Sequence, residues 1–159
     1  MTYLGIDPGT ATTGFGVIEK RKSNSQEFKI LNFGVISTKK TESDAKRLHI
    51  LFNDITALIK EYKPSIVGIE KLYFTSNQTT AMTVSQARGV VLLACEQSEL
   101  QILEFTPLQV KSTLCGYGKA DKKQVQKMVQ ITFGLKEIPK PDDAADALAI
   151  ALCAATWQR

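Results

Sequence analysis

The sequence predicts an α/β fold in which a mixed sheet of five strands is flanked by helices on both faces. Three extended segments follow one another at the start of the chain, and helical and extended patterns alternate after them. The fourth extended segment, 65–69, is apolar after Ser65, as expected of a central strand covered on both sides. With 159 residues the chain has the size of one compact domain, so we expect residues 1–159 to form a single domain.

The first two strands are predicted to form a hairpin. Residues 3–6 have the pattern of a short buried strand that ends at Asp7-Pro8-Gly9, and 14–18 resume an extended pattern after a loop of small residues. A third strand is predicted over 28–37, and a fifth over 102–105, before Thr106 and Pro107.

Helical periodicity predicts five helices. Thr41 and Ser43 are candidate caps for the first helix, and Pro64 closes it. A long helix is predicted from about residue 80 to residue 98. The last three are predicted over 107–114, 121–133 and 143–156.

Composition limits the class of protein. The three cysteines, Cys95, Cys115 and Cys153, have neither disulfide nor zinc spacing, which predicts buried thiols in a reducing compartment. No apolar run approaches the length of a membrane span and no signal peptide is recognisable, so a cytoplasmic protein is expected. The net charge is +4, and 111–140 alone holds seven lysines against two acids, which predicts one electropositive face.

Four acidic residues are the main functional signal. Asp143 and Asp146 lie three positions apart at the start of a nearly uncharged apolar helix, so both fall on one side of it. Asp7 and Glu70 stand at the ends of two predicted strands. For Asp142 alone, the preferred interpretation is that it caps the helix and balances its dipole.

Carboxylates brought together at the edge of a core repel one another unless a cation neutralises them. Four of them form a hard, oxygen-rich site for divalent metal, of the kind that activates water against a phosphodiester. Two Mg²⁺ ions about 3.5–4 Å apart would supply the needs of that reaction. The one histidine, His49, lies inside the first predicted helix, which disfavours histidine-dependent nucleophilic catalysis.

The chain resembles the bacterial RuvC-type Holliday-junction resolvases of the RNase H-like superfamily. The resemblance runs from Gly5-Ile6-Asp7-Pro8-Gly9-Thr10 to Asp143-Ala144-Ala145-Asp146-Ala147-Leu148. Between these motifs lie Ile69-Glu70, Ser85-Gln86-Ala87-Arg88-Gly89, Pro107-Leu108-Gln109-Val110-Lys111 and Gln124-Val125-Gln126. Each motif is weak alone, but their order and spacing are specific.

The resemblance implies an RNase H-like fold and a nuclease that cuts two strands of like polarity in a four-way DNA junction. It implies that Asp7, Glu70, Asp143 and Asp146 are the catalytic metal ligands, with Mg²⁺ as the cofactor and Mn²⁺ as a substitute. It also implies a homodimer acting in recombination and repair, and it leaves open whether a branch-migration helicase complex is a partner.

The resemblance implies DNA-binding residues as well. Lys111 and Lys122 match basic residues that handle DNA near the scissile phosphate. Tyr73 matches an aromatic residue that stacks on an unpaired base, although the family more often has phenylalanine there, so Phe74 is a second candidate. The lysine-rich segment adds Lys119 and Lys123 as further candidates.

Three other functions are weighed against this one. The segment 5–14 also resembles the first phosphate loop of the actin, sugar-kinase and Hsp70 ATPases, but those proteins need two such domains and this chain has room for one. A metal-free scaffold for branched DNA would be favoured if one of the four acids were an amide or alanine. A related RNase H-like nuclease that acts on RNA or on another branched structure shares the same carboxylates and remains an alternative.

The predicted helix 80–98 carries more apolar residues than one stripe facing a sheet requires. Either it is buried on two sides, or it packs against its own copy across a two-fold axis, with Ala87 and Gly89 permitting close approach. The symmetry of a four-way junction favours the second interpretation.

Overall fold

The structure is a computed structural model that describes residues 1–21, 27–71 and 78–157. Its described part contains one five-stranded sheet made of β1 (Thr2–Asp7), β2 (Thr12–Lys20), β3 (Phe28–Ser37), β4 (Ile66–Glu70) and β5 (Gln101–Phe105). The strand order is β3-β2-β1-β4-β5, with β2 antiparallel to both its neighbours and β1, β4 and β5 parallel to one another. The predicted mixed sheet is therefore confirmed.

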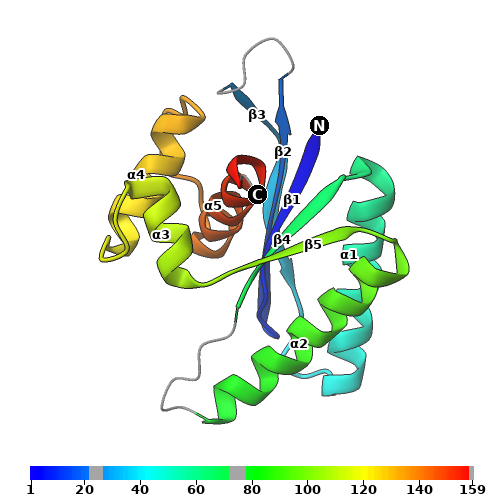
Figure 1. Cartoon of the computed structure of the whole chain (residues 1–159). Coiled ribbons are helices and arrows are strands. Elements are labelled where there is room, and N and C mark those ends of the chain that lie inside the picture. The colour runs from blue at the N-terminus through cyan, green and yellow to red at the C-terminus, as the bar shows by residue number, and fades with distance from the viewer. Residues whose placement is uncertain (22–26, 72–77, 158–159) are drawn as a thin grey trace.

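Helices cover both faces of the sheet, as predicted (Figure 1). One face packs against α1 (Asp44–Tyr62) and α2 (Gln78–Gln97). The other face packs against α3 (Pro107–Cys115), α4 (Lys122–Thr132) and α5 (Asp142–Thr156). Among the described helices none has both the length and the apolar character needed to cross a bilayer.

The strands alternate their side chains between these two layers. Leu4 and Ile6 of β1 belong to the core beneath α1 and α2, whereas Tyr3 belongs to the core beneath α5. The hairpin strands are longer than the apolar pattern predicted, because pairing continues from Thr2 opposite Glu19 to Asp7 opposite Gly14. Backbone pairing needs no apolar side chain, so periodicity underestimates its extent.

Local capping explains where three helices begin. The Ser43 hydroxyl accepts a hydrogen bond from the Lys46 N–H, which confirms it as the cap of α1. Thr106 and Asp121 each form a reciprocal capping box with the glutamine three residues later, at the starts of α3 and α4. The start of α4 therefore fixes the position of its first residue, Lys122.

Helix α5 packs unusually close to the sheet. A Cβ on Gly5 would collide with the Ala147 carbonyl oxygen and the Ala151 nitrogen. A Cβ on Gly16 would lie 2.9 Å from the backbone nitrogen of Leu148, closer than real Cβ contacts allow. The helix itself is rich in alanine and is buried from Ala147 to Ala155. The backbone of α5 thus packs directly on the backbone of the strands. This contact sets the distance between the first turn of α5 and the sheet.

The layer of α1 and α2 packs differently, through large aliphatic side chains. Leu51 and Ile55 of α1 and Val91 of α2 are buried against the strands. Arg88 of α2 forms an ion pair with Glu104 of β5, with 2.6 Å between Nη2 and Oε1. These contacts hold α2 on the sheet and leave its outer side facing solvent.

Candidate active site

Two of the predicted acids stand side by side at the carboxyl edge of the sheet. Asp7 is the last residue of β1 and Glu70 the last residue of β4, and these parallel strands pair with Ile6 opposite Ile69. Gly5 and Gly68, two residues earlier in each strand, both face α5. Asp7 and Glu70 therefore share that face, at the edge where ligands bind in open α/β sheets.

The first turn of α5 brings the other acids to the same edge. The backbone of Asp143 lies directly over Gly14 of β2, where any Cβ would collide with the Asp143 carbonyl oxygen. Asp146 follows one turn later, and 29% of its side chain is exposed, against 64% for Asp142. Asp146 thus turns towards the sheet while Asp142 stays at the outside.

Electrostatic coupling shows that these groups form one cluster. Burial, then the charges of Glu70, Asp146 and Asp143, raises the pKa of Asp7 to about 7. Burial and the charge of Asp146 likewise raise the pKa of Glu70. Burial, together with the charges of Asp142 and Asp143, raises the pKa of Asp146 in spite of the opposing effect of Lys122. The cluster carries more negative charge than its surroundings balance.

Two of the predicted lysines lie beside this cluster. Lys122 Nζ is 3.0 Å from Asp146 Oδ2 and 3.3 Å from Asp142 Oδ2. Burial lowers the pKa of Lys122, but its hydrogen bonds and ion pairs with these two acids raise the pKa overall. The charges of Lys122 and Lys111 both lower the pKa of Glu70, which places Lys111 near Glu70.

The donor set fits a hard divalent cation. It consists of carboxylate oxygens, partly buried and mutually repelling, which is the chemistry that Mg²⁺ and Ca²⁺ prefer. In the described residues, however, no group of three or more His, Cys, Asp or Glu side chains is arranged to hold a metal ion. The cluster therefore has the charge and chemistry for a metal, but its side chains are not arranged to coordinate one.

A family model described as "Crossover junction endodeoxyribonuclease RuvC" matches residues 3–154 of the chain. The chain belongs to the RuvC family. It is 51% identical over 153 residues to the crossover junction endodeoxyribonuclease RuvC of Caldicellulosiruptor saccharolyticus, which covers 96% of this chain and 91% of that protein. It is 52% identical to the RuvC protein of Desulfitobacterium hafniense strain DCB-2, again over 96% of this chain and 91% of the relative.

Solved structures of the RuvC family agree with this fold. The Thermus thermophilus RuvC structure superposes with a TM-score of 0.89 at 33% identity, covering 96% of this chain and 92% of that one. The same protein in complex with a Holliday junction substrate gives a TM-score of 0.90 at 33% identity, with the same coverage. The predicted RNase H-like fold is therefore confirmed.

The remaining predicted residues lie apart from the carboxylate cluster or outside the described chain. Lys119 and Lys123 are exposed, just before α4 and in its first turn, and neither forms an ion pair within the described residues. Tyr73 and Phe74 lie outside the described residues, so their stacking role stays a prediction. His49 is exposed on α1 in the opposite layer, with its Nε2 3.1 Å from Asn53 Nδ2.

Sequence reasoning missed Arg47, which lies in the first turn of α1 and shares a cavity with Asp143. No local signal singles it out, because Lys46 carries the same charge in the same turn of α1. Only the tertiary contact of Arg47 with Thr38 distinguishes the two.

Proposed function

We propose that this chain is a structure-specific endodeoxyribonuclease that resolves four-way (Holliday) DNA junctions, hydrolysing phosphodiesters in two strands of like polarity during recombination and repair. The observation that carries the proposal is the cluster of Asp7, Glu70, Asp143 and Asp146 at one sheet edge, in a chain of the RuvC family. The relatives named as crossover junction endodeoxyribonucleases support the activity, and the Thermus thermophilus complex supports the substrate.

In this proposal Asp7, Glu70, Asp143 and Asp146 are both catalytic residues and metal ligands for two Mg²⁺ ions, which Mn²⁺ can replace. Bound divalent cations stabilise charge on the phosphoryl oxygens and lower the pKa of the attacking water. Lys122 holds Asp146 in place and, with Lys111, adds positive charge where the scissile phosphate must approach the carboxylates. Without such charge a phosphate would be repelled from the cluster.

The other DNA contacts are also proposals. Lys119 and Lys123, which are exposed near Lys122, neutralise backbone phosphates along the arms of the junction. Tyr73 or Phe74 stacks on an unpaired base at the junction centre, a contact worth about 1–3 kcal/mol per base.

A homodimer suits a substrate that is cut twice, because one domain over 1–159 holds one carboxylate cluster. The outer side of α2 offers the contact surface, where Met82 is 68% and Leu93 52% exposed and Gly89 faces open space. The predicted part of Ala87 in this interface is wrong, because Ala87 is fully buried against the sheet. The cytoplasm is the proposed compartment, and a branch-migration helicase complex is a possible further partner.

One assay tests the function. A labelled four-way junction, a linear duplex and an RNA–DNA hybrid are incubated with the protein and Mg²⁺, and the products are sized on a gel. We expect paired, symmetric cuts in the junction alone. Preferential cleavage of the hybrid would favour the alternative of an RNA-directed nuclease.

The metal requirement is tested in the same assay. Mg²⁺ and Mn²⁺ should support cleavage, whereas Ca²⁺ should support binding with little turnover because it prefers more ligands at longer distances. Robust cleavage in EDTA would contradict a metal-dependent reaction.

A further inference from the structure

A cavity of about 390 Å³ lies next to the carboxylate cluster. Its lining consists of residues 9–12, which lead from β1 into the first residue of β2 and are called the loop 9–12 below, together with Arg47, Thr83, Val84 and Asp143. Asp143 belongs both to this cavity and to the cluster, so the two are continuous. Among the described residues that line the cavity, Arg47 alone carries a positive charge and Asp143 alone a negative one. The proposed reaction so far gives this cavity no role.

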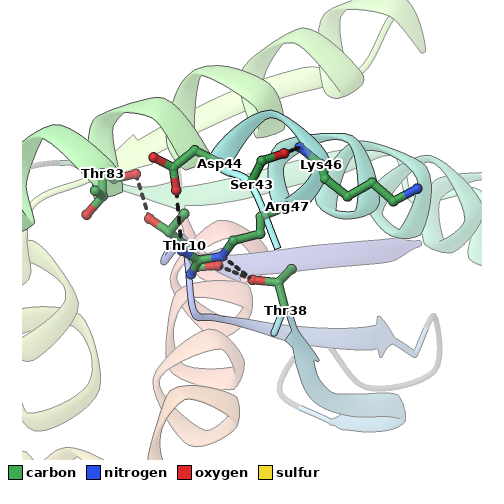
Figure 2. A network of polar contacts seen from close by, with 7 residues as sticks. All are labelled: Thr10, Thr38, Ser43, Asp44, Lys46, Arg47 and Thr83. Carbon is green, nitrogen blue, oxygen red and sulfur yellow. Dashed lines mark hydrogen bonds and ion pairs between the residues drawn. The ribbon is translucent and has the colours of Figure 1, made fainter. Parts of the chain in front are cut away.

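The guanidinium of Arg47 is held in one position (Figure 2). Its Nε donates a hydrogen bond to the Thr38 hydroxyl at 2.9 Å, and 13% of its side chain is exposed. Its Nη1 lies 3.5 Å from an oxygen of Asp44, but the Asp44 side chain is 66% exposed, so water screens that pair. The charge of Arg47 is thus fixed in place and only weakly neutralised.

The same network fixes the wall of the cavity. Thr38 donates from its hydroxyl to the Thr10 carbonyl oxygen at 2.7 Å, and the Thr10 hydroxyl donates to the Thr83 carbonyl oxygen at 2.7 Å. Figure 2 shows these contacts joining β3, the loop 9–12 and α2 around Arg47. At Gly9 a Cβ would collide with the Thr12 carbonyl oxygen, so the loop is tight, and short side chains leave the cavity open.

This arrangement suits an anion that can accept hydrogen bonds from a guanidinium. A phosphate group matches the planar fork of donors on an arginine. A DNA strand whose scissile phosphate lies at the carboxylates continues on both sides, and the cavity adjoins the carboxylates through Asp143, which lines it. Its next backbone phosphate is then the anion within reach of Arg47.

We propose that Arg47 and the loop 9–12 form a binding subsite for the DNA backbone phosphate that neighbours the scissile phosphate. This inference rests on the proposed nuclease function and adds a strand contact to it. Arg47 binds the phosphate, and Thr38 is a positioning residue that holds Arg47. The competing explanation is that Arg47 only joins α1 to β3, and the experiment separates the two.

The first test compares Arg47→Gln with Lys46→Gln. Lys46 precedes Arg47 on α1, carries the same charge, is exposed, and points away from Arg47 in Figure 2. Binding to a junction and to a linear duplex is measured by fluorescence anisotropy in Ca²⁺ over a range of salt. Arg47→Gln should weaken binding about tenfold and reduce the log–log salt slope by about 0.9, the value for one phosphate. Lys46→Gln should leave the slope unchanged.

The second test identifies the phosphate. Single methylphosphonate linkages, which carry no charge, replace each phosphate next to the scissile one. A methylphosphonate at one of these linkages should weaken binding by the wild type. The same linkage should cause no further loss of binding by Arg47→Gln. Thr38→Val keeps the charge of Arg47 but removes the hydroxyl that holds it, so this variant should weaken binding with the salt slope unchanged. If Arg47→Gln does not fold, Thr38→Val takes its place in the linkage test.

Additive losses at every linkage would overturn the subsite, and so would an Arg47→Gln variant that melts at a lower temperature but keeps the wild-type salt slope. Either result would favour the joining role. A wild type that binds duplex as well as it binds the junction would instead overturn the proposed function. In that case the linkage test would be made on the duplex. A single linkage whose methylphosphonate weakens binding by the wild type but not by Arg47→Gln would still support the subsite.

Discussion

The two helical layers of this molecule meet the sheet in different ways. On one side the backbone of α5 lies directly against glycines such as Gly5 and Gly14, where a Cβ would collide with backbone carbonyl oxygens of the helix. On the other side α1 and α2 are separated from the strands by side chains such as Ile55 and Val91. Contact between backbone and backbone fixes the position of a helix more closely than contact through side chains, which can change rotamer.

This difference matches the roles that we propose for the two layers. The first turn of α5 carries Asp143 and Asp146, which are two of the four proposed metal ligands. The layer of α1 and α2 lines the cavity at Arg47 and has an exposed helix face. Close backbone packing is therefore found on the side of the proposed catalytic residues.

The largest expected effect is at the carboxylate cluster itself. Asp7→Asn should abolish junction cleavage while leaving binding intact or stronger, because it removes a metal ligand and also a charge that repels DNA. Cleavage is measured on gels with Mg²⁺, and binding by anisotropy with Ca²⁺. Asp142→Asn is the control on α5: Asp142 is exposed, so this variant should cleave normally. Wild-type cleavage by Asp7→Asn would refute the site.

A pH series in EDTA sharpens the comparison. Folded Asp7 keeps its proton up to its raised pKa of about 7, whereas the unfolded chain releases it near 3.8. The stabilisation from this group is therefore fully present below about pH 4 and lost as the pH rises to about 7. Relative to Asp7→Asn, wild type should lose up to about 4 kcal/mol of unfolding free energy between pH 4 and 8, at about 1.4 kcal/mol per unit.

Urea unfolding at each pH measures this loss. Mg²⁺ should reduce the difference between the two proteins at pH 8, since a bound cation favours the ionised carboxylates. A difference that does not change with pH would mean that Asp7 is not buried among like charges.

The difference in packing between the two layers can be tested by changing one methyl group in each layer. Gly5→Ala should lower the free energy of unfolding by about 3 kcal/mol and impair cleavage, because the new Cβ pushes against backbone atoms of α5. Ile55→Val, on the layer of α1 and α2, should cost about 0.5–1.5 kcal/mol and leave cleavage unchanged. Urea unfolding and the junction assay measure both, and equal costs with equal activity would remove the distinction between the layers.

The smallest effect concerns the outer surfaces of the two layers. Leu93→Gln on α2 should weaken the dimer about tenfold, equivalent to about 1.4 kcal/mol, by making the proposed contact surface polar. Ile131→Gln is the matched control on α4, where Ile131 is 59% exposed. Analytical ultracentrifugation over a range of concentrations measures the dissociation constant. A wild type that stays monomeric, or equal weakening by both variants, would place the interface elsewhere or exclude it.

Much of this molecule follows from local pattern. Alternating and helical periodicities, with the candidate cap at Ser43, were enough to predict the order of the strands and helices along the chain, because neighbouring residues alone decide them. The grouping of Asp7 with Glu70 could also be predicted, since adjacent parallel strands end at one edge of a sheet.

Other features depend on contacts between segments distant in the sequence. Local pattern did not distinguish Lys122, which reaches Asp146, from Lys123 beside it. It did not show that Ala87 faces the sheet, that Gly14 supports Asp143, or that Arg47 reaches Thr38. Periodicity shows which face of a helix is apolar. The distance and rotation at which that face packs on the sheet depend on how the atoms of the helix and the strands fit together. Those atoms come into contact only when the chain has folded.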